Sequence, residues 1–433
     1  MSYAVSAFLG SHGFVEHTDV ASVADSILFD MDEGLHRRKA DQDMIRTWTA
    51  KPEKNCVNKS VIVIDAGGTN FRSCLVTFDG EGKGEISFME KTRMPGVERE
   101  LGRKEFFDQI ALNLEHLKDK ADCIGFCFSY PMEITEDGDG ILLGFSKEVK
   151  APEVVGSHIG KCLSDALVEH GWKRPKRIAL LNDTEAALLA GVSSSAGGKK
   201  YSSYIGFILG TGMNAAYIQG ASSEIGISKP EIIVCEVGKF CKIPRSTFDI
   251  EFDKTSTKPG TFFMEKSSSG AYLGPISFYA LQAAARDGLF SKNLAEKILG
   301  MKDLTLIELD TFLHTPYNTS STLGAMLAEN GSAQDYERVF EILDAIVERS
   351  ARLAAAILVA NVVKSGEGKD PTKPVCIVCN GTTYYKTHKI ALRVQNYLEE
   401  ILTKQRGLYW ETVCVENDIT MGAAIAGTLN IDK

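Results

Sequence analysis

The chain has 433 residues, of which 44% are hydrophobic and 24% charged, and its formal net charge is −9. This length favours two domains over one compact core, and the acidic balance argues against a nucleic-acid binder and a basic membrane-surface protein. No apolar run approaches the roughly 18 residues of a membrane span, and the start MSYAVSAFLGSHGF lacks basic residues ahead of a long apolar run, so we expect neither a membrane segment nor a secretory signal.

Helix and strand patterns alternate along the first half of the chain. Apolar residues at three- and four-residue spacing, beginning with Val20 and Val23, predict helix over roughly the first 50 residues. Strands are then predicted at 61–65, 86–90, 123–131 and 178–183, with an amphipathic helix over 106–120 and a short helix after residue 183.

The second half begins after a Ser/Gly-rich turn at 193–200, where the apolar strand YIGFIL starts. Long helical patterns follow at roughly 272–312 and 334–364, before the strand VCIVCNG (375–381) and a final helix near residue 422. Strands that alternate with helices in this way predict an α/β protein.

One strand–turn–strand pattern occurs twice in the sequence. Residues 61–77 (VIVIDAGGTNFRSCLVT) and 204–220 (YIGFILGTGMNAAYIQG) both place a tight turn rich in Gly and Thr, ending in Asn, between two apolar strands. Because glycine lets the backbone approach phosphate oxygens, each turn can offer amides to a phosphate chain. We expect the two turns to face each other across a cleft.

The first of these turns, DAGGTNFR (65–72), follows a buried strand directly. Thr69 can donate a hydroxyl hydrogen bond, and Asp65 is placed to hold Mg²⁺ through its waters, since this ion dehydrates reluctantly. A plain β-hairpin turn with a capping aspartate is the alternative interpretation. The second turn, GTGMNAA (210–216), fits a dinucleotide-binding pattern, but a strand rather than a helix is predicted after it, and no P-loop motif is present.

Asn182 and Asp183 end a buried strand where a helix begins, a position at which ligands gather in α/β sheets. An aspartate there suits acceptance of a proton from a hydroxyl that is being phosphorylated. Capping of the following helix is the alternative role for Asp183.

A sugar site needs several acids and amides, because a sugar is a ring of hydroxyls. Lys147 has the charge to neutralise a transferring phosphoryl group. The candidates for the sugar site are Asn214, Glu236 and Glu265, each of which is alternatively a solvated surface group.

The ten cysteines are scattered, mostly in apolar segments, which favours reduced thiols and a cytoplasmic location. Cys376 and Cys379 form a CxxC, but neither a second CxxC nor paired histidines lie nearby. We therefore do not expect a zinc or redox site.

Several segments, in the right order over nearly the whole chain, resemble the eukaryotic-type hexokinases, including glucokinase. DAGGTNFR is similar to the family's DLGGTNFR, and the longest match is FDIEFDKTSTKPGTFFMEKSSSGAYLG (248–274). The remaining matches are GFCFSYP (125–131), FSK (145–147), LLNDTEAALLAG (180–191), ILGTGMNAAYI (208–218) and CNGTTYYKTH (379–388).

The resemblance implies an ATP-dependent hexokinase that uses Mg²⁺, phosphorylates the 6-hydroxyl of glucose or a related hexose, and feeds glycolysis. Asp183 would be the general base, assisted by Lys147. The hexose would be lined by Ser129, Tyr130, Ser146, Lys147, Asn182, Asp183, Asn214, Glu236 and Glu265. The nucleotide would be held by Asp65, Ala66, Gly67, Gly68, Thr69, Asn70, Arg72, Gly210, Thr211, Gly212, Gly381 and Thr382.

The implied fold is the two-domain actin-like ATPase fold, a duplicated ribonuclease-H-like core with an interdomain cleft. A helical segment (1–57) would pack on the large domain (183–417), and the C-terminal helix (418–433) would return to the small domain (58–182). The oligomeric state, monomer or homodimer, is left open.

The chain departs from the family pattern mainly in the sugar region. Val234 and Val237 replace an asparagine and a tryptophan, Pro275 replaces a frequent glutamate, and ENDITMGAA (416–424) replaces a glycine-rich segment. Ser146 and Tyr130 replace threonine and phenylalanine, and we expect the Tyr130 phenol at the sugar. Two other functions stay open, a catalytically silent sugar sensor and an ATPase that acts on protein partners.

Overall fold

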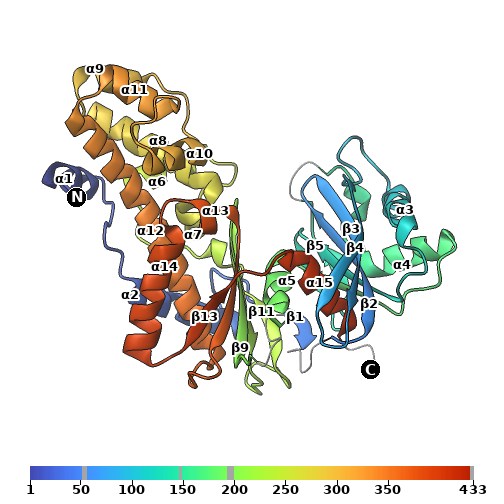
Figure 1. Ribbon diagram of the computed structural model, residues 1–433. Coiled ribbons are helices and arrows are strands. Elements are labelled where there is room, and N and C mark those ends of the chain that lie inside the picture. Colours follow the sequence, from blue (N-terminus) through green and yellow to red (C-terminus); the bar gives the residue numbers. More distant parts are fainter. Residues whose placement is uncertain (51–55, 146–148, 193–198, 430–433) are drawn as a thin grey trace.

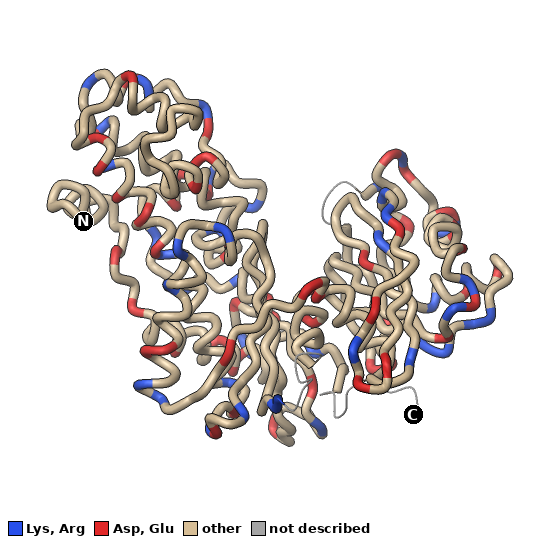
Figure 2. Tube along the Cα trace, viewed as in Figure 1, with Lys and Arg blue, Asp and Glu red and all other residues tan. Residues whose placement is uncertain are grey.

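The computed structural model describes residues 1–50, 56–145, 149–192 and 199–429. They form two lobes, each built on one β-sheet, with two helices packed between the sheets (Figure 1). Lys and Arg are interspersed with Asp and Glu along the trace of both lobes (Figure 2). None of the described helices combines the length and the apolar character that a membrane crossing requires.

The smaller lobe contains a five-stranded sheet of order β4-β3-β2-β5-β8. Its strands are β2 (Lys59–Gly67), β3 (Asn70–Phe78), β4 (Gly84–Arg93), β5 (Cys123–Phe128) and β8 (Arg177–Leu181). A hairpin of β6 (Met132–Ile134) and β7 (Gly140–Leu142) and the helices α3 (Arg103–Asn113) and α4 (Ile159–Glu169) complete the lobe, with the short 3₁₀ turns η1 (Glu115–Leu117) and η2 (Pro152–Val154). The amphipathic helix predicted to residue 120 therefore ends earlier, at Asn113.

The larger lobe contains a six-stranded sheet of order β1-β11-β10-β9-β12-β13. Its strands are β1 (Ile45–Ala50), β9 (Ser203–Leu209), β10 (Met213–Gln219), β11 (Glu231–Val234), β12 (Val375–Asn380) and β13 (Trp410–Val413). The prediction of helix throughout the first 50 residues is wrong for β1, which pairs antiparallel with β11. Its Thr-Trp-Thr sequence suits a pleated strand, and tertiary pairing decides its structure.

Helices cover the larger lobe, and its hydrophobic core gathers around the long helix α12. The N-terminal helices α1 and α2 both contact α12. The helices are α1 (Tyr3–Ser11), α2 (Val20–Leu35), α6 (Thr247–Thr255), α7 (Phe263–Ser268), α8 (Gly270–Arg286), α9 (Lys292–Leu299), α10 (Leu306–His314), α11 (Thr322–Asn330), α12 (Ala333–Ser365), α13 (Thr382–Lys386) and α14 (Ile390–Leu398), with the short helices η4 (Val237–Lys239) and η5 (Glu399–Gln405).

The two sheets share one topology, which confirms the duplicated core. β2 pairs antiparallel with β3 and parallel with β5, and β9 pairs in the same way with β10 and β12. Each sheet then adds a further parallel strand, β8 or β13, followed by a helix. The domain boundaries at 57, 182 and 417 stay a prediction.

In each lobe, the helix that follows the last strand of the duplicated core packs on the sheet of the other lobe. α5 (Asp183–Ala190) follows β8 and packs on β9, whereas α15 (Asp418–Thr428) follows β13 and packs on β2 and β5. α5 and α15 also cross each other between the sheets (Figure 1). A Cβ on Gly422 would lie 1.8 Å from the carbonyl oxygen of Ala186, so glycine is required where the helices touch. This crossing brings the first residues of α5 and α15 between the lobes.

Candidate active site

The start of α5 presents Asp183 at the carboxyl end of β8. Asn182 is the N-cap of the helix, and its Oδ1 accepts a hydrogen bond of 2.8 Å from the Glu185 amide. Asp183 is the first helical residue, and its Oδ1 accepts a hydrogen bond of 3.2 Å from the Thr184 hydroxyl. The cap is therefore Asn182 and not Asp183, which removes capping as the explanation for this aspartate.

Asp183 lies within electrostatic reach of one acid on each lobe. Burial raises the pKa of Asp65, at the end of β2; Arg72 opposes this shift, and the charge of Asp183 adds to it. Burial also raises the pKa of Glu236, after β11, and Asp183 again adds to the shift. One carboxylate is thus coupled to a phosphate-turn residue on the smaller lobe and to a sugar-site candidate on the larger lobe.

The first phosphate turn (Asp65–Arg72) is the hairpin between β2 and β3. Gly67 pairs with Asn70 across the hairpin, and Gly68 has a φ of +66°, a conformation that favours glycine. Arg72 Nη1 lies 3.4 Å from Asp65 Oδ2, and the side chains of Thr69, Asn70 and Arg72 are exposed. The hairpin interpretation is therefore correct for the backbone, while Asp65 pairs with a cation rather than capping the turn.

The segment after β5 is tied to the first phosphate turn. The Ser129 amide donates a 3.1 Å hydrogen bond to the carbonyl of Ala66. The Tyr130 hydroxyl donates a 2.8 Å hydrogen bond to the carbonyl of Gly68, and the ring is buried. The phenol that distinguishes this chain from the family pattern thus contacts the phosphate turn.

The second phosphate turn (Gly210–Gly212) joins β9 to β10, so the strand predicted after its glycines is confirmed and the dinucleotide pattern is excluded. The carbonyl of Gly210 accepts hydrogen bonds from the Gly270 amide at 2.8 Å and from the Thr383 hydroxyl at 2.9 Å. Gly381 has a φ of +114°, and a Cβ there would lie 2.1 Å from the Leu209 carbonyl oxygen. The predicted adenosine segment, with exposed Thr382, therefore adjoins this turn.

Three sugar-site candidates, Asn214, Glu236 and Glu265, which we call the acid wall, lie together on the larger lobe. Asn214 Nδ2 donates a 2.7 Å hydrogen bond to Glu236 Oε1. Glu265 Oε2 accepts one of 3.1 Å from the Met213 amide, and Oε1 accepts one of 3.4 Å from the Tyr272 hydroxyl. Burial raises the pKa of Glu265. The acid wall is thus a partly buried set of hydrogen-bonding groups.

The departures Val234 and Val237 belong to the hydrophobic cores. Both side chains are buried in apolar clusters, so these substitutions add core contacts. Pro275 lies inside α8, six residues along the helix. Ser146 and Lys147 lie outside the described residues.

Sequence reasoning missed Asp418, the first residue of α15. It is buried, its Oδ2 accepts a 2.6 Å hydrogen bond from Asn380 Nδ2, and its charge raises the pKa of Asp65. The signal was the replacement of a glycine-rich segment by ENDITMGAA. Within the described ranges, no set of three or more His, Cys, Asp or Glu residues is arranged to hold a metal ion on its own.

All ten cysteines are free and lie in the described part of the chain. Cys376 and Cys379 are buried on β12, where burial raises the pKa of each thiol to about 12. Both thiols are therefore protonated at neutral pH, a state that suits neither metal binding nor redox exchange.

Comparison with known proteins gives consistent results over nearly the whole chain. Two sequence-family models, both described as Hexokinase, match residues 204–429 and 11–193. Hexokinase-1 of Schizosaccharomyces pombe is 29% identical over 94% of this chain and 87% of its own length, and the Hexokinase-like 1 protein of Arabidopsis thaliana is 27% identical over the same shares. The structure of a Schistosoma mansoni hexokinase complexed with glucose has a TM-score of 0.77 at 24% identity and covers 98% of this chain and 99% of that one. The fold is thus the actin-like ATPase fold.

Proposed function

The chain belongs to the hexokinase family and is a hexose kinase, and we propose that it transfers the γ-phosphoryl group of ATP to the 6-hydroxyl of glucose or a related hexose in the cytoplasm. The observation that carries this proposal is the position of Asp183, whose charge acts on Asp65 of one lobe and on Glu236 of the other. A proton acceptor between a phosphate turn and a set of sugar-binding groups is what phosphorylation of an alcohol requires.

In the proposed reaction the hexose hydroxyls are held by the acid wall. Carboxylates accept hydrogen bonds from hydroxyls, and Asn214 both donates and accepts. Asp183 then takes the proton of the 6-hydroxyl as the oxygen attacks the γ-phosphorus. Catalysis in this reaction class depends mainly on positioning and charge neutralisation, and Lys147 is the proposed cation from the sequence.

The phosphate chain would lie between the two phosphate turns, whose glycines allow close approach of backbone amides. Asp65 fits a role as the Mg²⁺ holder, because the charges of Asp183 and Asp418 act on it and, among the described residues, Arg72 opposes them through a contact of 3.4 Å. When bound there, Mg²⁺ would neutralise charge on the β- and γ-phosphates. Water mediation suits Asp65, since the described side chains do not form a complete ligand set.

The test measures ADP release with glucose, mannose, fructose and glucosamine, using ATP and pyrophosphate as donors. Asp183→Ala is expected to lower kcat by about 10²–10⁴-fold or more while leaving glucose binding measurable by calorimetry. Asp165→Ala, which changes an exposed aspartate on α4, is the matched control and is expected to keep wild-type kcat.

The outcomes separate the candidate functions. An Asp183→Ala variant that keeps most of its glucose phosphorylation rate would remove Asp183 from the role of general base. Wild-type protein that binds glucose without ADP release would be a sugar sensor. ATP hydrolysis that no hexose stimulates would support an ATPase that acts on protein partners.

A further inference from the structure

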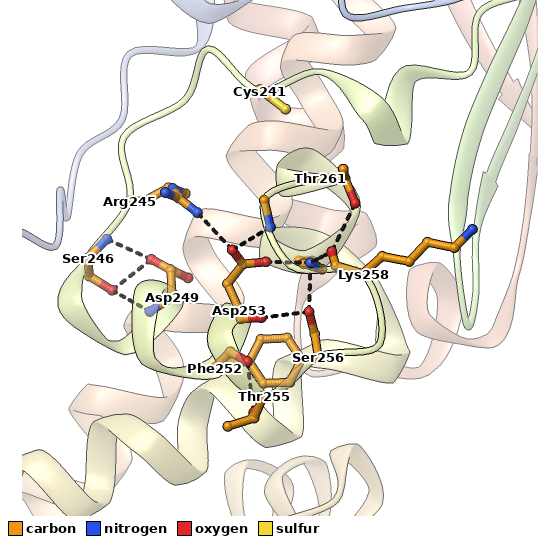
Figure 3. Close-up of polar contacts among 12 residues, drawn as sticks. Cys241, Arg245, Ser246, Asp249, Phe252, Asp253, Thr255, Ser256, Lys258 and Thr261 are labelled. Carbon is orange, nitrogen blue, oxygen red and sulfur yellow. Dashed lines mark hydrogen bonds and ion pairs between the residues drawn. The ribbon is translucent and has the colours of Figure 1, made fainter.

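A buried ion pair lies directly behind Glu265 of the acid wall. Lys266, the next residue on α7, is only 6% exposed. Its Nζ donates hydrogen bonds to Asp253 Oδ1, to Ser256 Oγ at 2.9 Å and to the Lys258 carbonyl at 2.7 Å (Figure 3). An ammonium group has three hydrogens, so each has an acceptor. A buried charge is tolerated only when it is paired and hydrogen-bonded in this way.

The same pair fixes the loop 256–261, which connects α6 to α7. The Gly260 amide donates a 2.9 Å hydrogen bond to Asp253 Oδ2, and the Thr261 hydroxyl donates one of 2.9 Å to the Lys258 carbonyl (Figure 3). Burial alone would raise the pKa of Asp253, but Lys266 and the Gly260 amide hold this pKa below its ordinary value. Asp253 is therefore a charged group at neutral pH.

α7 depends on such contacts for its position. It has six residues, and its N-cap, Phe262, adopts a left-handed conformation without a capping side chain. Helices this short are not stable by themselves. Glu265 on this helix contacts the Met213 amide, and a Cβ on Gly212 would lie 2.8 Å from Glu265 Oε2. Because the carboxylate fits so closely against this turn, a small rotation of α7 would move it away from its partners.

We propose that Lys266 and Asp253 are positioning residues that hold α7, and with it the Glu265 carboxylate, in the geometry that binds the hexose. The inference rests on the proposed function of Glu265 in sugar binding. It predicts that loss of the ion pair weakens hexose binding through Glu265, in addition to any loss of stability.

A second buried ion pair, whose acid also lies on α6, provides a matched control. Arg349 donates hydrogen bonds of 2.7 and 2.8 Å to the two carboxylate oxygens of Asp249, on α6. Both side chains of this pair are buried, as in the Lys266–Asp253 pair. In the described part of the chain, the hydrogen bonds of Arg349 and Asp249 join them to each other and to Ser246 and not to the loop 256–261. We therefore expect loss of this pair to change stability without releasing α7.

The experiment compares Lys266→Met, the double variant Lys266→Met/Asp253→Asn, Arg349→Met and Glu265→Gln by Tm and by KM and kcat for glucose and ATP. We expect the single Lys266 variant to lose Tm, because buried Asp253 loses its main cationic partner and keeps only the longer ion pair of 3.6 Å with Arg245 and the Gly260 amide. The double variant is expected to regain part of this loss, because it no longer buries the Asp253 charge. In both, the KM for glucose is expected to rise by about tenfold to a hundredfold, with the KM for ATP little changed, because a displacement of about 1 Å is sufficient for such a loss.

Arg349→Met is expected to lose Tm while keeping the wild-type KM for glucose. A double variant with a wild-type KM for glucose, or a KM that follows Tm across all variants including Arg349→Met, would overturn the inference. If Glu265→Gln itself leaves the KM for glucose unchanged, the assignment of Glu265 to the sugar fails, and the positioning role is overturned with it. If the KM for glucose rises in Glu265→Gln but not in the two Lys266 variants, the positioning role is overturned while the proposed function stands.

Discussion

The acid wall of the larger lobe and the first phosphate turn of the smaller lobe differ in how firmly their side chains are held. In the acid wall, Glu236 and Glu265 accept hydrogen bonds from Asn214, the Met213 amide and Tyr272. In the first phosphate turn, Thr69, Asn70 and Arg72 are exposed, and the contact between Arg72 and Asp65 is 3.4 Å long.

In the proposed reaction, we expect this difference to separate recognition of the sugar from binding of the phosphates. Buried polar groups need partners, so the acid wall is organised by the protein before any hydroxyl arrives. A site with fixed donors and acceptors rejects molecules that leave those groups unpaired. The exposed side chains of the first phosphate turn have no such constraint, and we expect them to gain partners when a charged ligand binds.

Among the tests of this comparison, the largest effect is expected in the acid wall. Glu236→Ala removes the acceptor of Asn214 and leaves a partly buried amide unpaired, so the KM for glucose is expected to rise by about 100-fold or more while the KM for ATP stays within about threefold. Steady-state kinetics with each substrate varied in turn checks this. Equal increases in both KM values would remove the distinction between the two regions.

The second prediction concerns the free energy that burial of an acid requires. Glu185, on α5, is 1% exposed, and burial raises its pKa to about 7 from an ordinary 4.5. Between pH 4.5 and about 7, Glu185 binds a proton more strongly in the folded chain than in the unfolded chain. Its contribution to the free energy of unfolding therefore falls as the pH rises through this range and becomes constant above about pH 7. Glu185→Gln is therefore expected to gain on the order of 2 kcal/mol over wild type at pH 8 and much less at pH 5.

Denaturant unfolding at both pH values measures this gain. Glu337→Gln, which changes an exposed glutamate on α12, is the control and is expected to follow the wild-type pH dependence. A gain for Glu185→Gln that is the same at pH 5 and pH 8 would contradict titration of this side chain as the cause.

The third prediction concerns Arg72 in the first phosphate turn. Because this side chain is half exposed, Arg72→Ala is expected to change the free energy of unfolding by less than about 0.5 kcal/mol. Loss of a charged contact with phosphate is expected to raise the KM for ATP by about tenfold and to leave the KM for glucose unchanged. A raised KM for glucose would show that the two regions are not independent.

The smallest expected effect comes from Tyr130→Phe, which removes only the hydroxyl that bonds to the Gly68 carbonyl. We expect the KM for ATP to rise by about threefold, since one neutral hydrogen bond contributes about 1 kcal/mol. A change in the KM for glucose alone would instead show that the Tyr130 hydroxyl acts at the sugar site, as the sequence resemblance implies.

The duplicated core and the two turns could be predicted because their signals are local. An apolar strand followed by Gly and Thr has a recognisable pattern wherever it occurs, and it occurs at 61–77 and at 204–220. The expectation that the CxxC is not a zinc or redox site rests on an equally local signal, since the absence of a second CxxC or paired histidines nearby is visible in the sequence.

The remaining features depend on contacts between distant segments. β1 is a strand because β11 lies beside it, and the exchange of α5 and α15 between the sheets leaves no local pattern. Asn380 ends β12 and Asp418 follows β13, so the two side chains come into contact only after these two strands have paired. The cap position of Asn182 depended on a boundary of one residue, which sequence patterns do not resolve.

The glycine at the crossing of α5 and α15 has a mechanical consequence. Backbone lies directly against backbone where Gly422 meets Ala186, so the two helices have no interlocked side chains at that point. If one lobe tilts relative to the other, we expect this contact to be the pivot. Asp183 begins α5 only three residues before Ala186 and hardly moves in such a tilt, whereas the outer ends of both lobes sweep through a longer arc.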